Sequence, residues 1–100
     1  MGPFDQVMPQ IVAMEKGYDM AFIDALRHGE KGLQFKAQID AMERRMLNSY
    51  SETSFWAHKK IRDKINKDAG KLCRDMGLEM GDLSKRPDEV RKGLMERLKG

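Results

Sequence analysis

The spacing of apolar residues constrains this chain more than any other feature of its sequence. Apolar side chains recur every three or four positions along most of its length, without a convincing alternation of apolar and polar residues. A spacing of three and four residues places side chains on one face of an α-helix, whereas a half-buried strand needs a spacing of two. The sequence therefore predicts an all-α protein.

Four segments carry this helical pattern. We expect helices over residues 4–28, 30–48, 53–76 and 87–99, packed as a compact bundle of four to five helices. A fifth helix would result if the first segment were divided in two at Gly17. A glycine weakens a helix interior by about 1 kcal/mol, so Gly17 is a candidate break. A chain of 100 residues has enough length for one core, so we expect a single domain over residues 1–100.

Each expected helix has an apolar face that we predict to be buried. The four faces consist of Val7, Ile11, Met14, Tyr18, Ala21, Phe22 and Ala25; of Phe35, Ile39, Met42, Met46 and Tyr50; of Phe55, Ile61, Ile65, Ala69, Leu72 and Met76, with His58 among them; and of Val90, Leu94 and Leu98. The chain has 9 methionines, and their flexible side chains fit an irregular core. The methionines outside these faces are candidates for an adaptable protein-binding surface.

Residues with special backbone roles fall between these segments. Ser51 or Thr53 can cap the third helix by accepting a backbone hydrogen bond. Gly29 and Gly77 are expected to end the first and third helices, because glycine adopts the left-handed conformation of a helix end without strain. Leu78 stands where an apolar residue often completes such an end, the Schellman motif.

Positive charge is concentrated on the third expected helix. The net charge of the chain is +3, but residues 59–74 contain seven basic side chains and two aspartates. On a helical projection, Trp56 lies about 180° from the centre of the apolar face. Lys60, Asp63, Lys67, Lys71 and Arg74 lie along that side. The residues that we predict to contact a partner are Trp56, Lys60, Lys64, Lys67, Lys71 and Arg74. Cations neutralise phosphates and an indole stacks on a base, so this surface predicts nucleic-acid binding that depends strongly on salt.

Other interpretations of the same surface remain open. Tryptophan and arginine are frequent in protein interfaces, so the alternative is a protein-binding adaptor or inhibitor that acts on a protein or nucleoprotein partner. The size and composition are typical of the accessory proteins that phages, plasmids and small operons encode. A homodimer is a third possibility, because several apolar faces in a small chain can leave area that only a second copy covers. The structural alternative is a solvated basic face, with Trp56 packed under the N-terminal segment or the 49–54 connector.

The end of the third helix matches part of a helix-turn-helix pattern. The residues with the required spacing are Leu72, Cys73, Met76, Gly77, Leu78 and Leu83. Beyond them the pattern fails, because Arg86 stands where an apolar residue is usual and Pro87 would cut the recognition helix to about one turn. We therefore do not expect sequence-specific reading of bases.

The remaining residue patterns do not predict catalysis or a metal site. His28 and His58 lack a companion ligand at helical spacing, and Cys73 is the only cysteine, so we expect no metal and no cofactor. The sequence has no phosphate-binding loop and no nucleophile elbow, so we do not expect an enzyme. Carboxylates such as Glu15 and Asp63 are expected on the surface. Without a long apolar run or a signal peptide, we expect a cytoplasmic protein without membrane attachment.

Overall fold

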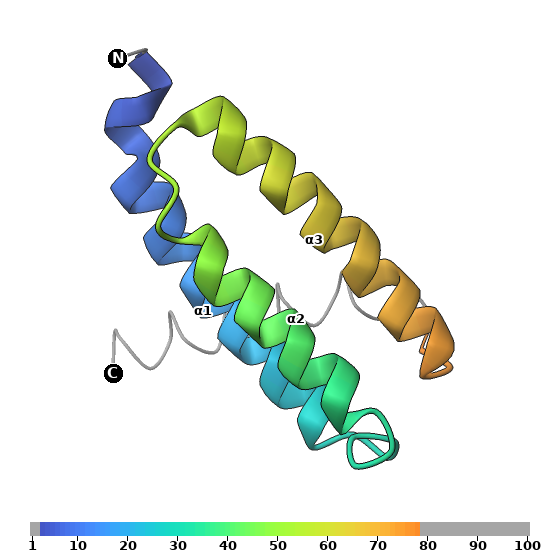
Figure 1. The fold of residues 1–100 in the computed structure, drawn as a ribbon. Helices are drawn as coiled ribbons and strands as arrows, with labels where there is room; N and C mark the ends of the chain where they lie inside the picture. The colour runs from blue at the N-terminus through green and yellow to red at the C-terminus, as the bar shows by residue number, and fades with distance from the viewer. Residues whose placement is uncertain (1–2, 79–100) are drawn as a thin grey trace, which may run out of the picture.

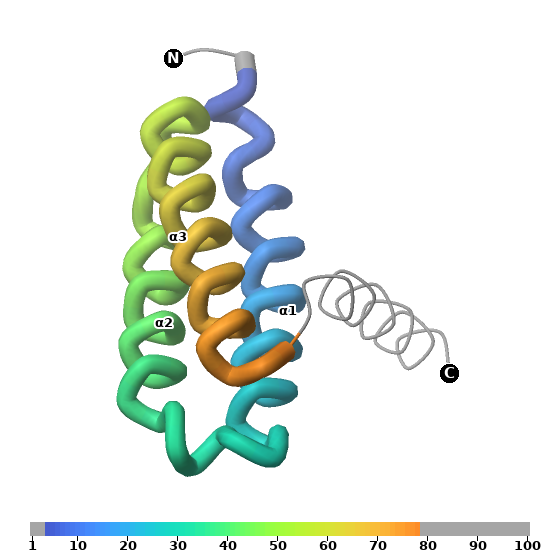
Figure 2. The backbone as a smooth tube through the Cα atoms, turned by 90° about the vertical axis from the view of Figure 1, so that its right-hand side faces the viewer, coloured from blue at the N-terminus to red at the C-terminus, as the bar shows by residue number. Residues whose placement is uncertain are grey.

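The computed structural model describes residues 3–78, which form a bundle of three α-helices preceded by a short 3-10 helix. The elements are η1 (Pro3–Val7), α1 (Met8–Arg27), α2 (Lys36–Ser49) and α3 (Phe55–Asp75). Consecutive helices run in opposite directions, and α3 lies alongside the other two (Figure 1 and Figure 2). The all-α class is therefore confirmed, with three helices among the described residues. The helix expected over residues 87–99 lies outside them.

The boundaries of the first two helices differ from the prediction. α1 continues through Gly17, so the candidate break at this residue is absent. The cost of one glycine is small beside the tertiary packing that stabilises a long amphipathic helix. α2 begins at Lys36 rather than at residue 30, because residues 28–35 form the turns that reverse the chain. In these turns a side chain on Gly32 would collide with the backbone, since its Cβ would lie 2.1 Å from the carbonyl oxygen of Arg27.

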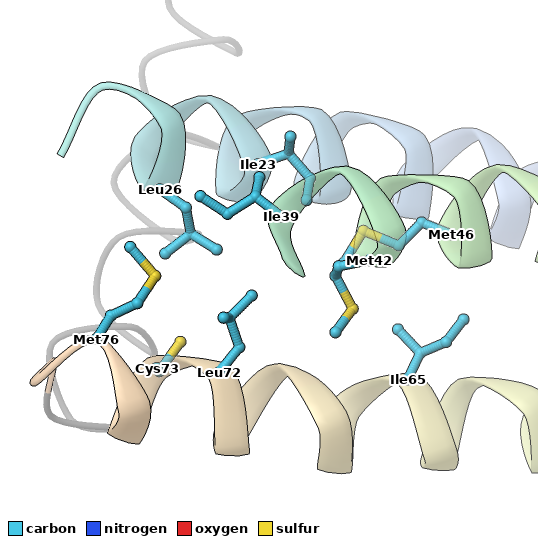
Figure 3. Packing of buried hydrophobic residues seen from close by; sticks show 9 residues of the cluster. All are labelled: Ile23, Leu26, Ile39, Met42, Met46, Ile65, Leu72, Cys73 and Met76. Carbon is cyan, nitrogen blue, oxygen red and sulfur yellow. The ribbon is translucent and has the colours of Figure 1, made fainter. Parts of the chain in front are cut away.

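The hydrophobic core lies between the three helices. Its buried side chains are Ile23, Leu26, Ile39, Met42, Met46, Ile65, Leu72, Cys73 and Met76, and they point toward one another from all three helices (Figure 3). The apolar face predicted for α2 is confirmed, and most of the face predicted for α3 is also buried or partly buried. Ile61 is the exception on α3, because it is exposed beside α2.

The buried face predicted for α1 is wrong by about a third of a turn. Val7 and Met14 were expected in the core, but they are 44% and 56% exposed. The inward side of α1 instead carries two acidic residues, Asp19, which is buried, and Glu15, which is partly buried. A projection that follows only apolar residues places these carboxylates outside, whereas the structure holds them against basic groups of α3. The expectation that Glu15 is a surface charge is therefore also wrong.

The C-terminal end of α3 is closed as predicted. Gly77 has a φ of 76°, the left-handed conformation that favours glycine. Its N–H donates to the carbonyl of Arg74 at 3.0 Å, and the N–H of Leu78 donates to the carbonyl of Cys73 at 2.8 Å. These two bonds define a Schellman motif. The left-handed ending expected at Gly29 is absent, because Gly77 is the only glycine with positive φ between residues 3 and 78.

The N-terminal end of α3 is capped from a distant part of the chain. The residue before the helix is Ser54, which makes no side-chain capping bond, so the predicted cap by Ser51 or Thr53 is wrong. The carboxylate of Asp5 instead accepts a hydrogen bond from the backbone N–H of Phe55 at 2.8 Å. An acidic group also interacts favourably with the positive end of a helix dipole. Asp5 thereby joins η1 to α3.

The helices of residues 3–78 are each too short or too polar to span a lipid bilayer.

Candidate functional site

The six residues predicted to bind a partner lie on one exposed side of α3. All of them are exposed, and Trp56 has 65% of its surface accessible. Because they follow one another at steps of three or four residues, they form a row about 27 Å long on the helix surface. The basic row, as we call it, consists of Lys60, Lys64, Lys67, Lys71 and Arg74, with Trp56 at its N-terminal end.

The cations of the basic row differ from the other two cations of α3 in their ion pairing. Arg62 pairs with Asp19 at 2.8 Å, and Lys59 pairs with Asp63 at 2.9 Å. The five residues of the basic row pair with no carboxylate anywhere in residues 3–78. No ion pair therefore neutralises these five cations, although Asp68 and Asp75 line the same hollow as Lys64 and Lys71, and the excess of positive charge raises the potential along this side of α3.

A shallow groove runs between α2 and α3 beside the basic row. Its two hollows have volumes of about 400 Å³ and 440 Å³ and share the side chains of Arg45, Lys64 and Asp68. Arg45 and Asp68 form an ion pair of 2.6 Å between the two helices. Lys60 borders the first hollow and Lys71 borders the second. The other two cations of the basic row, Lys67 and Arg74, do not line the groove.

Trp56 belongs to a cluster of three aromatic rings at one end of the bundle. This aromatic cluster consists of Phe4, Phe55 and Trp56. The indole meets Phe55 at 5.1 Å and Phe4 at 6.3 Å between ring centroids, both in edge-to-face geometry. Phe4 is itself 52% exposed. Trp56 therefore does pack against the N-terminal segment, as the structural alternative proposed, but most of its surface remains accessible.

A polar network that joins all three helices was not predicted from the sequence. Arg62 of α3 donates two hydrogen bonds of 2.8 Å to the carboxylate oxygens of Asp19, and its Nε lies 3.1 Å from Glu15. The hydroxyl of Tyr50, at the end of α2, also donates to Asp19. Burial opposes the charge of Arg62, but the hydrogen bond and the negative charge of Asp19 outweigh it and hold the pKa of Arg62 above its ordinary value.

His58 completes this network from the same face of α3. It is 3% exposed, and both of its ring nitrogens face oxygen acceptors. Nδ1 lies 3.0 Å from the carbonyl oxygen of Ser49, so this nitrogen carries a hydrogen. Nε2 lies 2.5 Å from the carboxylate of Glu15. The imidazole of His58 therefore connects α3 to the end of α2 through Ser49 and to α1 through Glu15.

The polar network is saturated by its own internal bonds. No buried side-chain nitrogen or oxygen within the described residues lacks a hydrogen-bond partner. Residues 3–78 also contain no group of three histidine, cysteine or acidic side chains arranged to hold a metal ion. A signal for the network was present in the sequence, because His58 interrupts an apolar face and Arg62 stands one helical turn after it. The partners on α1 gave no such signal.

Comparison with known proteins identifies no relative of this chain. No protein-family model matches the chain, and neither a curated protein nor a solved structure matches it.

Proposed function

We propose that the protein is a non-catalytic binding module that associates with nucleic acid through the basic row of α3. The observation that carries the proposal is the pattern of ion pairing. The other two cations of α3 have carboxylate partners, whereas the five of the basic row have none in residues 3–78. An array of cations that form no ion pair attracts a polyanion, because phosphates replace the mobile ions that otherwise accompany it.

The geometry of the row fits the spacing of a phosphate backbone. Lys60 and Arg74 are separated by about 21 Å along the helix axis, which corresponds to about six nucleotide steps of one duplex strand. If all five cations contact phosphates, the logarithm of the association constant should fall with the logarithm of salt concentration with a slope of about −4.5 on duplex DNA and about −3.5 on single strands. Such contacts position a backbone and carry no sequence preference.

The aromatic cluster supplies a stacking surface at the end of the row. Phe4 and Phe55 contact the indole of Trp56 in edge-to-face geometry, so they orient the ring while most of its surface stays accessible. Stacking of a base on an aromatic side chain contributes about 1–3 kcal/mol. Bases are available for stacking in single strands and at strand ends, so we expect Trp56 to favour those substrates over continuous duplex.

The experiment compares two double substitutions that change the net charge equally. Lys64→Glu/Lys67→Glu reverses the centre of the basic row, whereas Lys31→Glu/Arg44→Glu reverses two exposed cations elsewhere. Binding is measured by anisotropy of labelled single-stranded and duplex oligonucleotides at low and near-physiological salt. We expect the row variant to lose binding and the control to keep most of it. Equal losses in both variants, or no binding by the native protein at low salt, would overturn the proposal.

A second candidate function is binding to a protein partner through the aromatic cluster. Phe4, Val7 and Trp56 are all exposed apolar residues near the same end of the bundle. Aromatic residues of this kind commonly act as the energetic centre of a protein interface. A specific protein whose capture depends on Trp56 and not on Lys64 and Lys67 would favour this function.

A further inference from the structure

The groove between α2 and α3 contains an apolar side chain that the core does not cover. Ile61 is 39% exposed and lines the first hollow of this groove, the one of about 400 Å³, together with the buried Ile65. Lys60 and Lys64 of the basic row line the same hollow. A phosphate held by these two lysines therefore lies beside an accessible apolar surface.

The opposite wall of the first hollow comes from α2 and is polar. Arg45 and Asn48 line it, and both are exposed. Arg45 pairs with Asp68, the only carboxylate in the lining, so Lys60 and Lys64 supply an excess of positive charge. The side-chain amide of Asn48 forms no hydrogen bond within residues 3–78 and offers both a donor and an acceptor. The first hollow thus combines an apolar surface, a free amide and unpaired cations.

The second hollow of the groove fits an anionic ligand less well. Its lining contains Asp75 as well as Asp68, and two carboxylates oppose the approach of a phosphate. Its apolar residues, Met42 and Leu72, are only 2% and 6% exposed, so they offer little surface to a ligand. Among the two hollows, the first is the better match to a ligand with an apolar body and a negative charge.

The shape of the groove favours a small planar group over a helix of a protein partner. A helix that binds a groove uses several apolar anchors at successive turns. This groove exposes one apolar side chain, Ile61, and the Arg45–Asp68 ion pair of 2.6 Å crosses it. The volume of the first hollow is within the range of small-molecule sites, about 300–1,000 Å³. An unstacked base with its phosphates has the required apolar faces, polar edge and negative charge.

We propose that the first hollow receives a base of a single-stranded nucleic acid whose phosphates lie on Lys60 and Lys64. This inference rests on the proposed function and narrows its substrate to single strands, because the bases of a continuous duplex are stacked and paired. Ile61 contacts the face of the base, and the amide of Asn48 faces its edge. Trp56 precedes Ile61 by about 7.5 Å along the helix axis, so one strand can use both.

The test compares two substitutions of exposed aliphatic residues, Ile61→Ala in the hollow and Leu47→Ala on the opposite side of α2. Alanine favours helix at both positions, so both variants should fold. Anisotropy measures their binding to an adenine oligonucleotide of about ten nucleotides and to an abasic strand of equal length. We expect Ile61→Ala to weaken binding of the adenine strand about threefold to tenfold and binding of the abasic strand not at all. Its salt dependence should stay native, because the same cations contact phosphates. Leu47→Ala should bind both strands as the native protein does.

A second measurement locates the base directly. In the native protein, the methyl resonances of Ile61 should shift with the adenine strand and not with the abasic strand, because only a base has a ring current. Equal shifts with both strands, or native affinity of Ile61→Ala for the adenine strand, would overturn the base site and leave binding by the basic row intact. If the native protein bound neither strand at low salt, the proposed function would fail and this inference with it.

Discussion

The side chain of Arg62 connects all three helices. It links α3 to α1 through Asp19 and Glu15, and it lies 3.3 Å from the hydroxyl of Ser49 at the end of α2. Removing charges from water costs several kcal/mol per ion, and hydrogen bonds of good geometry offset that cost only while both partners are present. Loss of either partner therefore leaves the other charge buried without its counter-charge.

We expect Arg62→Met to reduce the free energy of unfolding by about 3–5 kcal/mol, because Asp19 is left buried without its cation. Arg62→Met/Asp19→Asn should recover part of the loss, since the amide of the new residue carries no charge and still accepts from Tyr50. Urea denaturation followed by circular dichroism measures both effects. A stability of Arg62→Met within about 1 kcal/mol of the native protein would show that the pair is unimportant.

At the scale of one element, α3 combines two unrelated surfaces on one helix. One side packs in the core and in the polar network, and the opposite side carries the basic row. Nothing within its own sequence segment caps its first turn, since the cap comes from Asp5. The position of the N-terminal turn of α3, and with it Trp56, is therefore tied to η1 rather than fixed by α3 alone.

We expect Asp5→Ala to destabilise the protein by about 1 kcal/mol through loss of this cap. Asp5→Asn should cost less, because its side-chain oxygen still accepts a hydrogen bond. Both variants should also change the emission of Trp56, since η1 carries Phe4 against the indole. Thermal unfolding and fluorescence spectra are the measurements. An Asp5→Ala variant with the native melting temperature and the native emission would refute this role of Asp5.

At the scale of the whole molecule, titratable groups limit stability on both sides of neutral pH. Hydrogen bonds from Lys36 and Arg27 lower the pKa of Asp40 from 3.8 to about 2, and the bond from Arg27 also lowers the pKa of Glu43. Burial raises the pKa of Cys73 from 9.0 to about 11. The carboxylates stabilise the fold in their charged form and the thiol in its neutral form. Stability therefore falls in acid as the carboxylates become protonated, and it falls in alkali as the thiol becomes ionised.

We therefore expect the stability to be greatest between about pH 5 and pH 9. The stabilisation from Asp40 is present above its ordinary pKa and is lost as the pH falls through about 2. The stabilisation from Cys73 is present below pH 9.0 and is lost as the pH rises through about 11. Urea midpoints across this range measure the profile, and Cys73→Ala should flatten its alkaline side. An unchanged alkaline decline in Cys73→Ala would show that the thiol does not cause it.

Much of the fold and of the candidate site follows from local pattern. The face of α2 was predictable because Ile39, Met42 and Met46 are apolar and point the same way. The ending of α3 was predictable because Gly77 and Leu78 act through hydrogen bonds within one turn. The basic row was predictable because helical spacing alone aligns its side chains. In each case the cause lies within a few residues of its effect.

The features that escaped prediction join residues far apart in the chain. Asp19 is buried because it meets Arg62, and Phe55 is capped because it meets Asp5. Apolar spacing assigns a carboxylate to the surface, and only a partner from another helix makes its burial favourable. The sequence by itself determined the helices and the exposed charge of α3. Tertiary structure decided which side of α1 faces inward, because that choice depends on complementary charges that no single segment contains.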